Sequence, residues 1–461
     1  MAASLLSSLT RRAATAAAMA AALVFVSAQN ASAQSLIRDA EIEDTLRVYA
    51  NPIFEAAGVR GDEVEIHIIN DDSVNAFVIN GQNMFVHTGL LMRADNPNEI
   101  IGVLAHETGH IAGGHVQRSR GAINQAMGPM LISIGLGVLA IAAGAPDAGA
   151  ALIAGSQQFA MADFVRFSQA QESSADQAGA TFLEASGQSG RGLISFFDHE
   201  IRPYEFMVRR APPWMMTHPF ASDRVEALRQ RVESASHRDA VDTEDNIRRF
   251  QFMQAKLIGF IRSESQTLSR YPLSDHSAPA RYARAIAYYR AAKLDRATAE
   301  LNSLIAEEPR NPYYQELMGQ ILFENGHADQ AIPYHRRSLE YAPGEPLLQV
   351  NLARALIAGG GNEGASEAIG LLNSVLAHEP DNGFAWREMA TARYERGEEA
   401  LAELASAEQS FSLGDYRTAL SFAERARRAL PRNTPDFQRA SDIANFAGDE
   451  MRRRDEQRGR T

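Results

Sequence analysis

The sequence predicts an α+β fold, in which a mostly helical domain with a small antiparallel sheet precedes an all-α domain of helical repeats. Short segments with alternating apolar residues lie between residues 64 and 86. Amphipathic patterns with helix-capping residues lie on both sides of these segments. In the C-terminal half, prolines that end helices recur at a regular interval. Together, these three observations indicate the fold class.

The composition is that of a globular protein. Of its 461 residues, 45% are hydrophobic and 22% are charged, which argues against wholesale disorder and against a multi-span membrane protein. Cysteine is absent, so disulfides, thiolate metal sites and a cysteine nucleophile are excluded. The net charge of −12 makes nucleic acid a poor partner, because phosphate backbones repel an acidic chain.

Residues 1–33 are predicted to be a secretory signal peptide. Arg11 and Arg12 precede an apolar core at residues 13–26, and Ala31-Ser32-Ala33 provides the small residues for cleavage before Gln34. An anchoring helix is the alternative, but the core is shorter than the ~20 residues that a spanning helix needs. We therefore expect export, most simply to a bacterial periplasm.

The first domain is expected to begin with a helix and a sheet. Residues 36–54 have an amphipathic helical pattern. Strand patterns follow, and an Asn80-Gly81 turn signal separates the last two of them. The expected strands are 64–69, 76–79 and 84–86.

Two further helices flank an apolar segment. Asn96 as the cap and Pro97 at the first helical position begin one helix, and the other covers roughly 160–186 and stops at Gly187. Residues 130–145 between them are apolar and uncharged. This segment could be a buried hairpin, a substrate-covering loop or a membrane-dipping segment. We favour burial, because the segment is short for a span.

From about residue 243 the chain is expected to be almost wholly helical, with an internal repeat. Pro309, Pro343 and Pro380 end successive helices at intervals of 34 and 37 residues, the second interval being lengthened by an insertion at 359–361. Small residues recur in the same order within the units, a pattern that resembles the tetratricopeptide repeat. A generic helical bundle is the alternative.

These patterns predict five divisions of the chain. They are a signal peptide over 1–33, a domain with the sheet over 34–240, a helical linker over 241–276, a repeat domain over 277–436 and a helical or disordered tail over 437–461.

The chemistry is expected at His106-Glu107-Thr108-Gly109-His110, an H-E-x-x-H motif on a predicted helix. Histidines four residues apart lie on one helix face, so both imidazoles can bind one ion. Glu107 follows the first histidine and can take a proton from a water whose pKa zinc has lowered to ~7. An ordinary amphipathic helix with two histidines is the alternative.

A third ligand is needed, and its position separates two classes of metalloprotease. A metzincin-type histidine ten residues after His106 would fall on Val116. His115 is one residue short, a rotation of ~100° that should turn it off the metal, so Gly113 matches that motif by coincidence. No glutamate lies between the motif and Glu172. We therefore assign Glu172 as the third ligand.

Asp176 lies one turn after Glu172 and on the same helix face. Such sites usually contain a carboxylate that orients a ligand histidine, and we assign Asp176 to that role. The alternative is a solvated helix charge.

The motifs together resemble the gluzincin family that contains the HtpX-like and prenyl-protein (CAAX) proteases. The resemblance covers residues 64–230, where four motifs occur in the family's order. The motifs are Asn75-Ala76-Phe77 with Thr88-Gly89-Leu90-Leu91, His106-Glu107-x-x-His110, Glu172-x-x-Ala175-Asp176, and Thr217-His218-Pro219 with Arg224.

The resemblance implies roles for further residues. Ala76 and Phe77 would lie on an edge strand that holds an extended substrate. His218 would lie near the metal, either as a fourth ligand of a latent state or as a group that stabilises the oxyanion, although it could also be a plain loop histidine. Arg224 would contribute a fixed positive charge that supports the transition state. The family often carries a polar residue at His115, to which we attach no catalytic role.

With the signal peptide and the repeats, the chain is most similar to periplasmic members of this family. The resemblance implies a zinc-dependent endopeptidase, with one Zn²⁺ per chain, that degrades misassembled outer-membrane β-barrel proteins and promotes their assembly. Implied partners are unfolded or misassembled outer-membrane proteins and, through the repeats, the outer-membrane assembly machinery. Peripheral membrane contact through 130–145 stays open as a weaker alternative to burial.

Two alternatives stay open at this point. The chain could be a chaperone or scaffold that works through its repeats, with a latent or dispensable zinc site. The ion is inferred from the ligand set, and nickel or cobalt could also occupy such a site in vitro.

Overall fold

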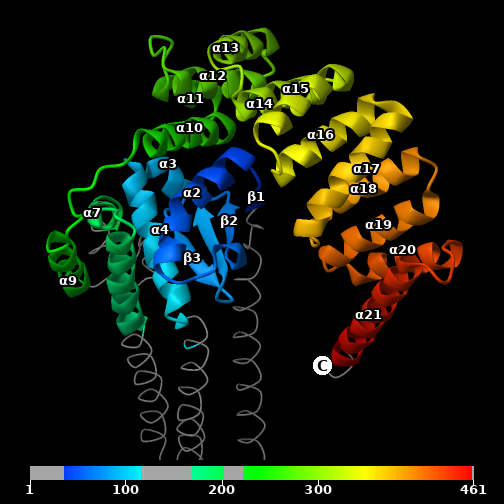
Figure 1. The fold of residues 1–461 in the computed structure, drawn as a ribbon, viewed down its shortest axis with the longest axis horizontal. Coiled ribbons are helices and arrows are strands. Elements are labelled where there is room, and N and C mark those ends of the chain that lie inside the picture. The colour runs from blue at the N-terminus through cyan, green and yellow to red at the C-terminus, as the bar shows by residue number, and fades with distance from the viewer. Residues whose placement is uncertain (1–35, 116–117, 119–167, 202–221, 459–461) are drawn as a thin grey trace, which may run out of the picture. The chain divides into compact units, whose positions relative to one another are not determined.

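The computed structural model describes residues 36–115, 118, 168–201 and 222–458. The chain forms two compact units (Figure 1). The first comprises Met1–Ile37 and Asn51–Val241, and the second comprises Arg38–Ala50 and Asp242–Thr461. The signal peptide over 1–33 and the apolar segment 130–145 lie outside the described residues. No described helix combines the length and apolar character needed to cross a membrane.

A four-stranded sheet lies in the first unit, with the strand order β1-β2-β4-β3. β1 and β2 pair antiparallel, as do β3 and β4, whereas β2 and β4 run parallel. The sheet is therefore mixed rather than antiparallel throughout. The reason is that β3 folds back on β4 through a tight turn, which leaves the other side of β4 for β2. The strands are β1 (Leu36–Ile37), β2 (Glu65–Ile69), β3 (Ala76–Ile79) and β4 (Asn83–His87).

The turn between β3 and β4 has the expected chemistry. Asn80 and Gly81 both have positive φ, 55° and 83°, in the three-residue connection 80–82 between the strands. Because β3 stands last in the strand order, it forms one edge of the described sheet.

Helices of different lengths complete the first unit. Helix α4 is buried along most of its length and packs against α7 and β3. Its start follows the predicted signals, since the Asn96 side chain accepts a hydrogen bond from the Glu99 amide and Pro97 is the first residue. The helices are α3 (Thr88–Arg93), α4 (Pro97–Ala112), an unlabelled helix at 168–185, α7 (Arg191–Phe196), the π-helical turn η3 (Phe197–Ile201) and α9 (Ser222–Glu233). A 3₁₀ turn, η2 (Gly61–Glu63), precedes β2.

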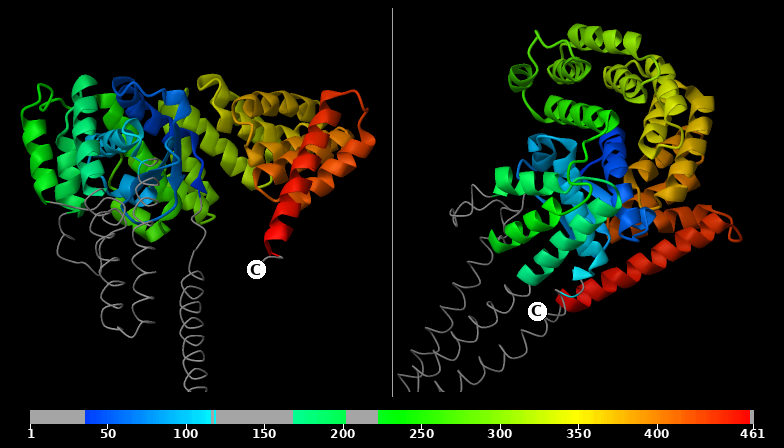
Figure 2. Two further views of the ribbon diagram at one scale, coloured as in Figure 1. Left: turned by 90° about the horizontal axis from the view of Figure 1, so that it is seen from below. Right: turned by 60° about the vertical axis from the view of Figure 1, so that its left-hand side comes forward.

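The second unit consists of helices that pack as successive antiparallel pairs (Figures 1 and 2). The first helices of successive pairs begin at Ala278, Pro312, Pro346 and Gly383, which reproduces the 34-residue period and its one longer interval. The helices are α10 (Glu244–Ile261), α11 (Glu264–Arg270), α12 (Ala278–Arg290), α13 (Leu294–Glu307), α14 (Pro312–Glu324), α15 (Ala328–Tyr341), α16 (Pro346–Gly359), α17 (Gly361–His378), α18 (Gly383–Glu395), α19 (Glu399–Ser412), α20 (Tyr416–Ala429) and α21 (Pro435–Arg458).

Helix α2 (Ala40–Ala56) is divided between the two units, its first residues grouping with the repeats. A buried ionic cluster around Lys256 of α10 holds the start of α2 to the repeat helices of the second unit. The ammonium lies 2.9 Å from Asp39, 3.3 Å from Glu41 and 3.6 Å from Glu316. Burial alone would lower the pKa of Lys256, but the surrounding acids and Tyr282 raise it well above its ordinary value. Lys256 is therefore charged and paired inside the protein.

We predict that Lys256→Ala destabilises the second unit by about 3–5 kcal/mol, because it leaves buried carboxylates without their counter-ion. The measurement is chemical unfolding of the mature chain followed by circular dichroism. The matched control is Lys293→Ala, whose ion pair with Glu264 at 2.6 Å is half-exposed and should contribute at most about 1 kcal/mol. Equal stability of both variants would contradict the prediction.

Candidate metal centre

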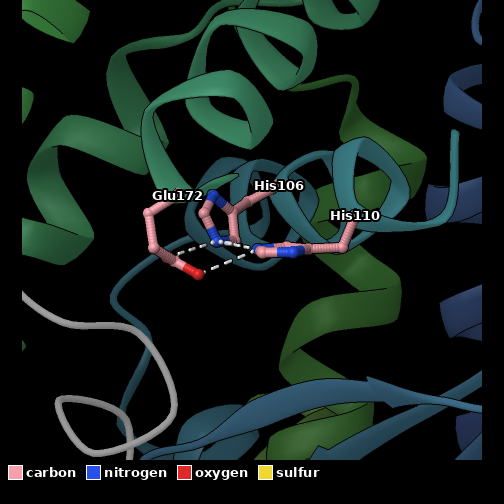
Figure 3. A group of neighbouring side chains, drawn as sticks. All are labelled: His106, His110 and Glu172. Atoms are coloured by element: carbon pink, nitrogen blue, oxygen red, sulfur yellow. Dashed lines mark hydrogen bonds and ion pairs between the residues drawn. The ribbon is translucent and has the colours of Figure 1, made fainter. Parts of the chain in front are cut away.

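Three buried side chains converge in the first unit: His106 and His110 from α4, and Glu172 from helix 168–185 (Figure 3). The two Nε2 atoms are 3.1 Å apart. Glu172 places one oxygen 3.4 Å from Nε2 of His106 and the other 3.2 Å from Nε2 of His110. Ligand atoms of a tetrahedral zinc lie about 3.3 Å apart, given bonds of about 2.0–2.1 Å. The donor set and its spacing therefore fit a zinc ion.

A close crossing of two helices brings these ligands together. A Cβ atom on Gly109 would lie 2.6 Å from the carbonyl oxygen of Ala175, so only glycine fits at this position. One turn away, a Cβ atom on Gly179 would lie 3.1 Å from the backbone of Ala105. The two contacts let α4 and helix 168–185 approach backbone to backbone, which brings Glu172 within reach of both histidines.

Asp176 orients the first ligand. Nδ1 of His106 donates to Oδ1 of Asp176 over 2.8 Å, and both side chains are fully buried. This hydrogen bond leaves Nε2 of His106 as the lone-pair nitrogen that faces His110 and Glu172. The solvated helix charge considered as an alternative for Asp176 does not fit this burial.

Arg224 of α9 contacts both carboxylates, Asp176 and Glu172. Its Nε donates to Asp176 over 2.5 Å, and one terminal nitrogen lies 3.1 Å from Glu172. The guanidinium also lies over the ring of Phe197, with 5.3 Å to the centroid. Arg224 is buried, so these contacts occur at low dielectric, where a fixed charge acts strongly on its neighbours.

The electrostatics of the pocket favour a positive charge between the carboxylates. Burial lowers the pKa of His106, but its hydrogen bonds with Asp176 and Glu172 outweigh burial and raise the pKa to about 10. Burial dominates at His110 and lowers its pKa. Glu107 is fully buried beside His106, and its charge acts on His110. A bound cation would provide the positive charge that this pocket favours.

His115 is not one of the three converging side chains, but it contacts one of them. Its Nδ1 lies 3.1 Å from Nδ1 of His110, on the other side of that ring. Sequence reasoning missed this contact because it extended α4 beyond its end. The helix stops at Ala112, and the signal that could have shown it is the Gly113-Gly114 pair.

The predicted substrate strand is β3, at the edge of the described sheet. Ala76 is fully buried, and Phe77 stacks on Phe85 with 5.2 Å between ring centroids. The pairing of β3 with β4 sets Phe77 opposite Phe85, and α4 packs against the same strand. His218, with Thr217 and Pro219, lies outside the described residues.

A second group of possible ligands, Asp95, Glu99 and His199, lies at the start of α4. Glu99 accepts a hydrogen bond from the Asp95 amide over 2.9 Å, at the start of α4, and one from the Ser195 hydroxyl of α7 over 2.6 Å. Asp95 and His199 are exposed. We assign this group to capping.

The fold and the donor set match a class of protein, the zincins, in which an H-E-x-x-H helix and a glutamate from a second helix hold the metal. The comparisons with known proteins agree. Residues 36–232 match the model of Peptidase family M48. The matched region contains the His106–His110–Glu172 group.

The relatives extend beyond this domain. The chain is 26% identical over 390 residues to the beta-barrel assembly-enhancing protease of Yersinia pestis, covering 83% of this chain and 78% of that protein. The Escherichia coli K12 protein of the same name is 28% identical over 332 residues, 70% of this chain and 66% of its own length. The chain therefore resembles these proteases. A crystal structure of yeast Tom70 covers 67% of this chain at 12% identity, with a TM-score of 0.29, too low to inform the fold.

We predict that Gly109→Ala abolishes zinc binding, because a methyl group 2.6 Å from the Ala175 carbonyl must push the two helices apart. The measurement is the zinc content of the purified chain by atomic absorption. The matched control is Gly370→Ala on α17, where an added Cβ atom meets no described atom within 4 Å beyond its own helix. This variant should keep its zinc, and its helix should be stabilised by about 0.5–1 kcal/mol. Full zinc content in Gly109→Ala would contradict the close crossing.

Proposed function

We propose that this chain is a zinc-dependent endopeptidase of the periplasm that degrades misassembled outer-membrane β-barrel proteins and promotes their assembly. The observation that carries the catalytic part is the buried His106–His110–Glu172 group with Glu107 in the same helical turn. The names of the relatives support the barrel-assembly part. The predicted signal peptide supports export.

The proposed mechanism assigns each step to a residue of the chain. His106, His110 and Glu172 would hold the zinc ion, which supplies carbonyl polarisation and a water of lowered pKa when bound. Glu107 takes the proton from the attacking water and returns it to the leaving amine nitrogen. Because Glu107 is fully buried, it acts where a proton is not lost to bulk solvent.

Asp176 and Arg224 are proposed to act through the ligands. Asp176 holds His106 by the 2.8 Å hydrogen bond, and Arg224 restrains Asp176 and Glu172 together. These contacts favour a positioning role for Arg224 over direct contact with the transition state. His218 is proposed as the group that sets latency or stabilises the oxyanion.

The substrate is proposed to add a strand to β3. The backbone amide of His87 donates to the Asn75 carbonyl. Hydrogen-bonded and non-hydrogen-bonded pairs alternate along an antiparallel ladder, so the backbone groups of Phe77 point toward Phe85 on β4. The backbone groups of Val78 then point away from β4, where an extended substrate could pair with them. Edge strands bind extended peptides through such groups. Val78 would provide the hydrogen bonds, and Ala76 and Phe77 would belong to the strand that holds the substrate.

The repeats are proposed to bind clients or the assembly machinery, since stacked helical pairs present extended surfaces to other proteins. A chaperone or scaffold with a dispensable zinc site is the second candidate. Genetic complementation separates the two: a scaffold retains function in Glu107→Gln, whereas an obligatory protease loses it.

We predict that Glu107→Gln lowers cleavage of an unfolded protein at least about a hundredfold while zinc stays bound, because the base is lost but the ligands remain. The measurement is cleavage by the purified mature chain together with its zinc content. Glu226→Gln on the exposed part of α9 is the matched control and should behave as wild type. Wild-type cleavage by a clean Glu107→Gln preparation would refute the mechanism. In the same assay, faster cleavage by His218→Ala would establish latency.

We predict that Val78→Pro lowers kcat/KM for peptides about fivefold, because it removes one backbone donor that the substrate would use, a loss of about 1 kcal/mol. An edge strand tolerates proline where the amide faces outward. Phe77→Pro is the contrasting variant and should destabilise the domain, since its amide faces β4. Unchanged kcat/KM in folded Val78→Pro would rule out this binding register.

A further inference from the structure

The two ligand histidines are oriented in different ways. Nδ1 of His106 donates to a carboxylate, Asp176. Nδ1 of His110 lies 3.1 Å from Nδ1 of His115, another imidazole. The His110 and His115 rings meet edge to face at 84°, with 5.0 Å between centroids, and His115 is only 3% exposed.

The backbone after α4 is built to bring His115 to this position. α4 ends at Ala112, and Gly114 has a φ of +60°, which reverses the chain. A Cβ atom on Gly113 would lie 2.4 Å from Nε2 of His115, so the imidazole occupies the space that a side chain at 113 would fill. Gln171 donates to the His115 carbonyl over 3.1 Å and so restrains its backbone.

The restraint comes from the helix that carries the third ligand. Gln171 immediately precedes Glu172, so one turn of helix 168–185 fixes both the carboxylate and the backbone of His115. The close helix crossing therefore fixes the positions of three side chains: Glu172 itself, His106 through Asp176, and His110 through His115.

We propose that His115 is a positioning residue for the metal: its Nδ1 accepts a hydrogen bond from Nδ1–H of His110. This bond fixes the His110 ring and its tautomer, so that Nε2 presents its lone pair beside Nε2 of His106. The inference rests on the proposed zinc site and adds the partner that orients its second histidine. In this role His115 acts through His110.

The test is the zinc affinity of the full mature chain, measured by competition with a chromogenic chelator. His115→Ala removes the acceptor and should weaken zinc binding about 10–100-fold. His115→Asn places an amide oxygen where Nδ1 lies and should stay within about threefold of wild type. Gly113→Ala displaces the imidazole and should weaken binding as His115→Ala does.

A second readout separates positioning from stability. Unfolding of the zinc-free chain should be the same for wild type and His115→Asn, and the absorption spectrum of the cobalt-substituted protein should change in His115→Ala but not in His115→Asn. Wild-type affinity in His115→Ala, or equal weakening in Ala and Asn, would overturn the proposal. Failure of the wild-type chain to bind zinc would overturn the proposed function, and this inference with it.

Discussion

The site depends on the close crossing of α4 and helix 168–185. Gly109 against Ala175 and Gly179 against Ala105 allow a backbone separation that larger residues would forbid. The ligand geometry follows from this contact and from helical periodicity. The histidines of α4 lie on either side of Gly109, and Glu172 and Asp176 flank Ala175. Small residues at the crossing are therefore as necessary to the site as its ligands.

The same crossing buries several charges, which is costly unless they are paired. Glu107, Glu172 and Asp176 are all nearly inaccessible to water, and Arg224 is the buried cation that contacts the last two. The raised pKa of His106 has the same origin, since the pocket holds more negative than positive charge. A divalent cation held by these residues would correct this imbalance. Metal binding at this site would then be coupled to the stability of the domain.

The sequence predicts the parts of the site that depend on spacing within one helix. The H-E-x-x-H motif and the turn from Glu172 to Asp176 are regular helix, so their faces follow from 100° per residue. His115 could not be placed in this way, because α4 ends before it and Gly114 reverses the chain. The parallel pairing of β2 with β4 also escaped prediction, since alternation identifies strands but not their neighbours. The function of Arg224 depends on contacts between helices far apart in the sequence.

The repeat unit includes residues from the beginning of the mature chain, Arg38–Ala50. Asp39 and Glu41 stand a few residues after the predicted cleavage site, and they supply two of the three acids around Lys256. The hydroxyl of Tyr282 donates to Glu41 over 2.9 Å, and Arg38 pairs with Glu379 at 3.0 Å. The N-terminal segment is thus part of the core of the repeat unit. A fragment that begins at residue 242 would leave Lys256 buried with Glu316 as its only acid among these three. The intact mature chain is therefore the form in which the repeats should be studied.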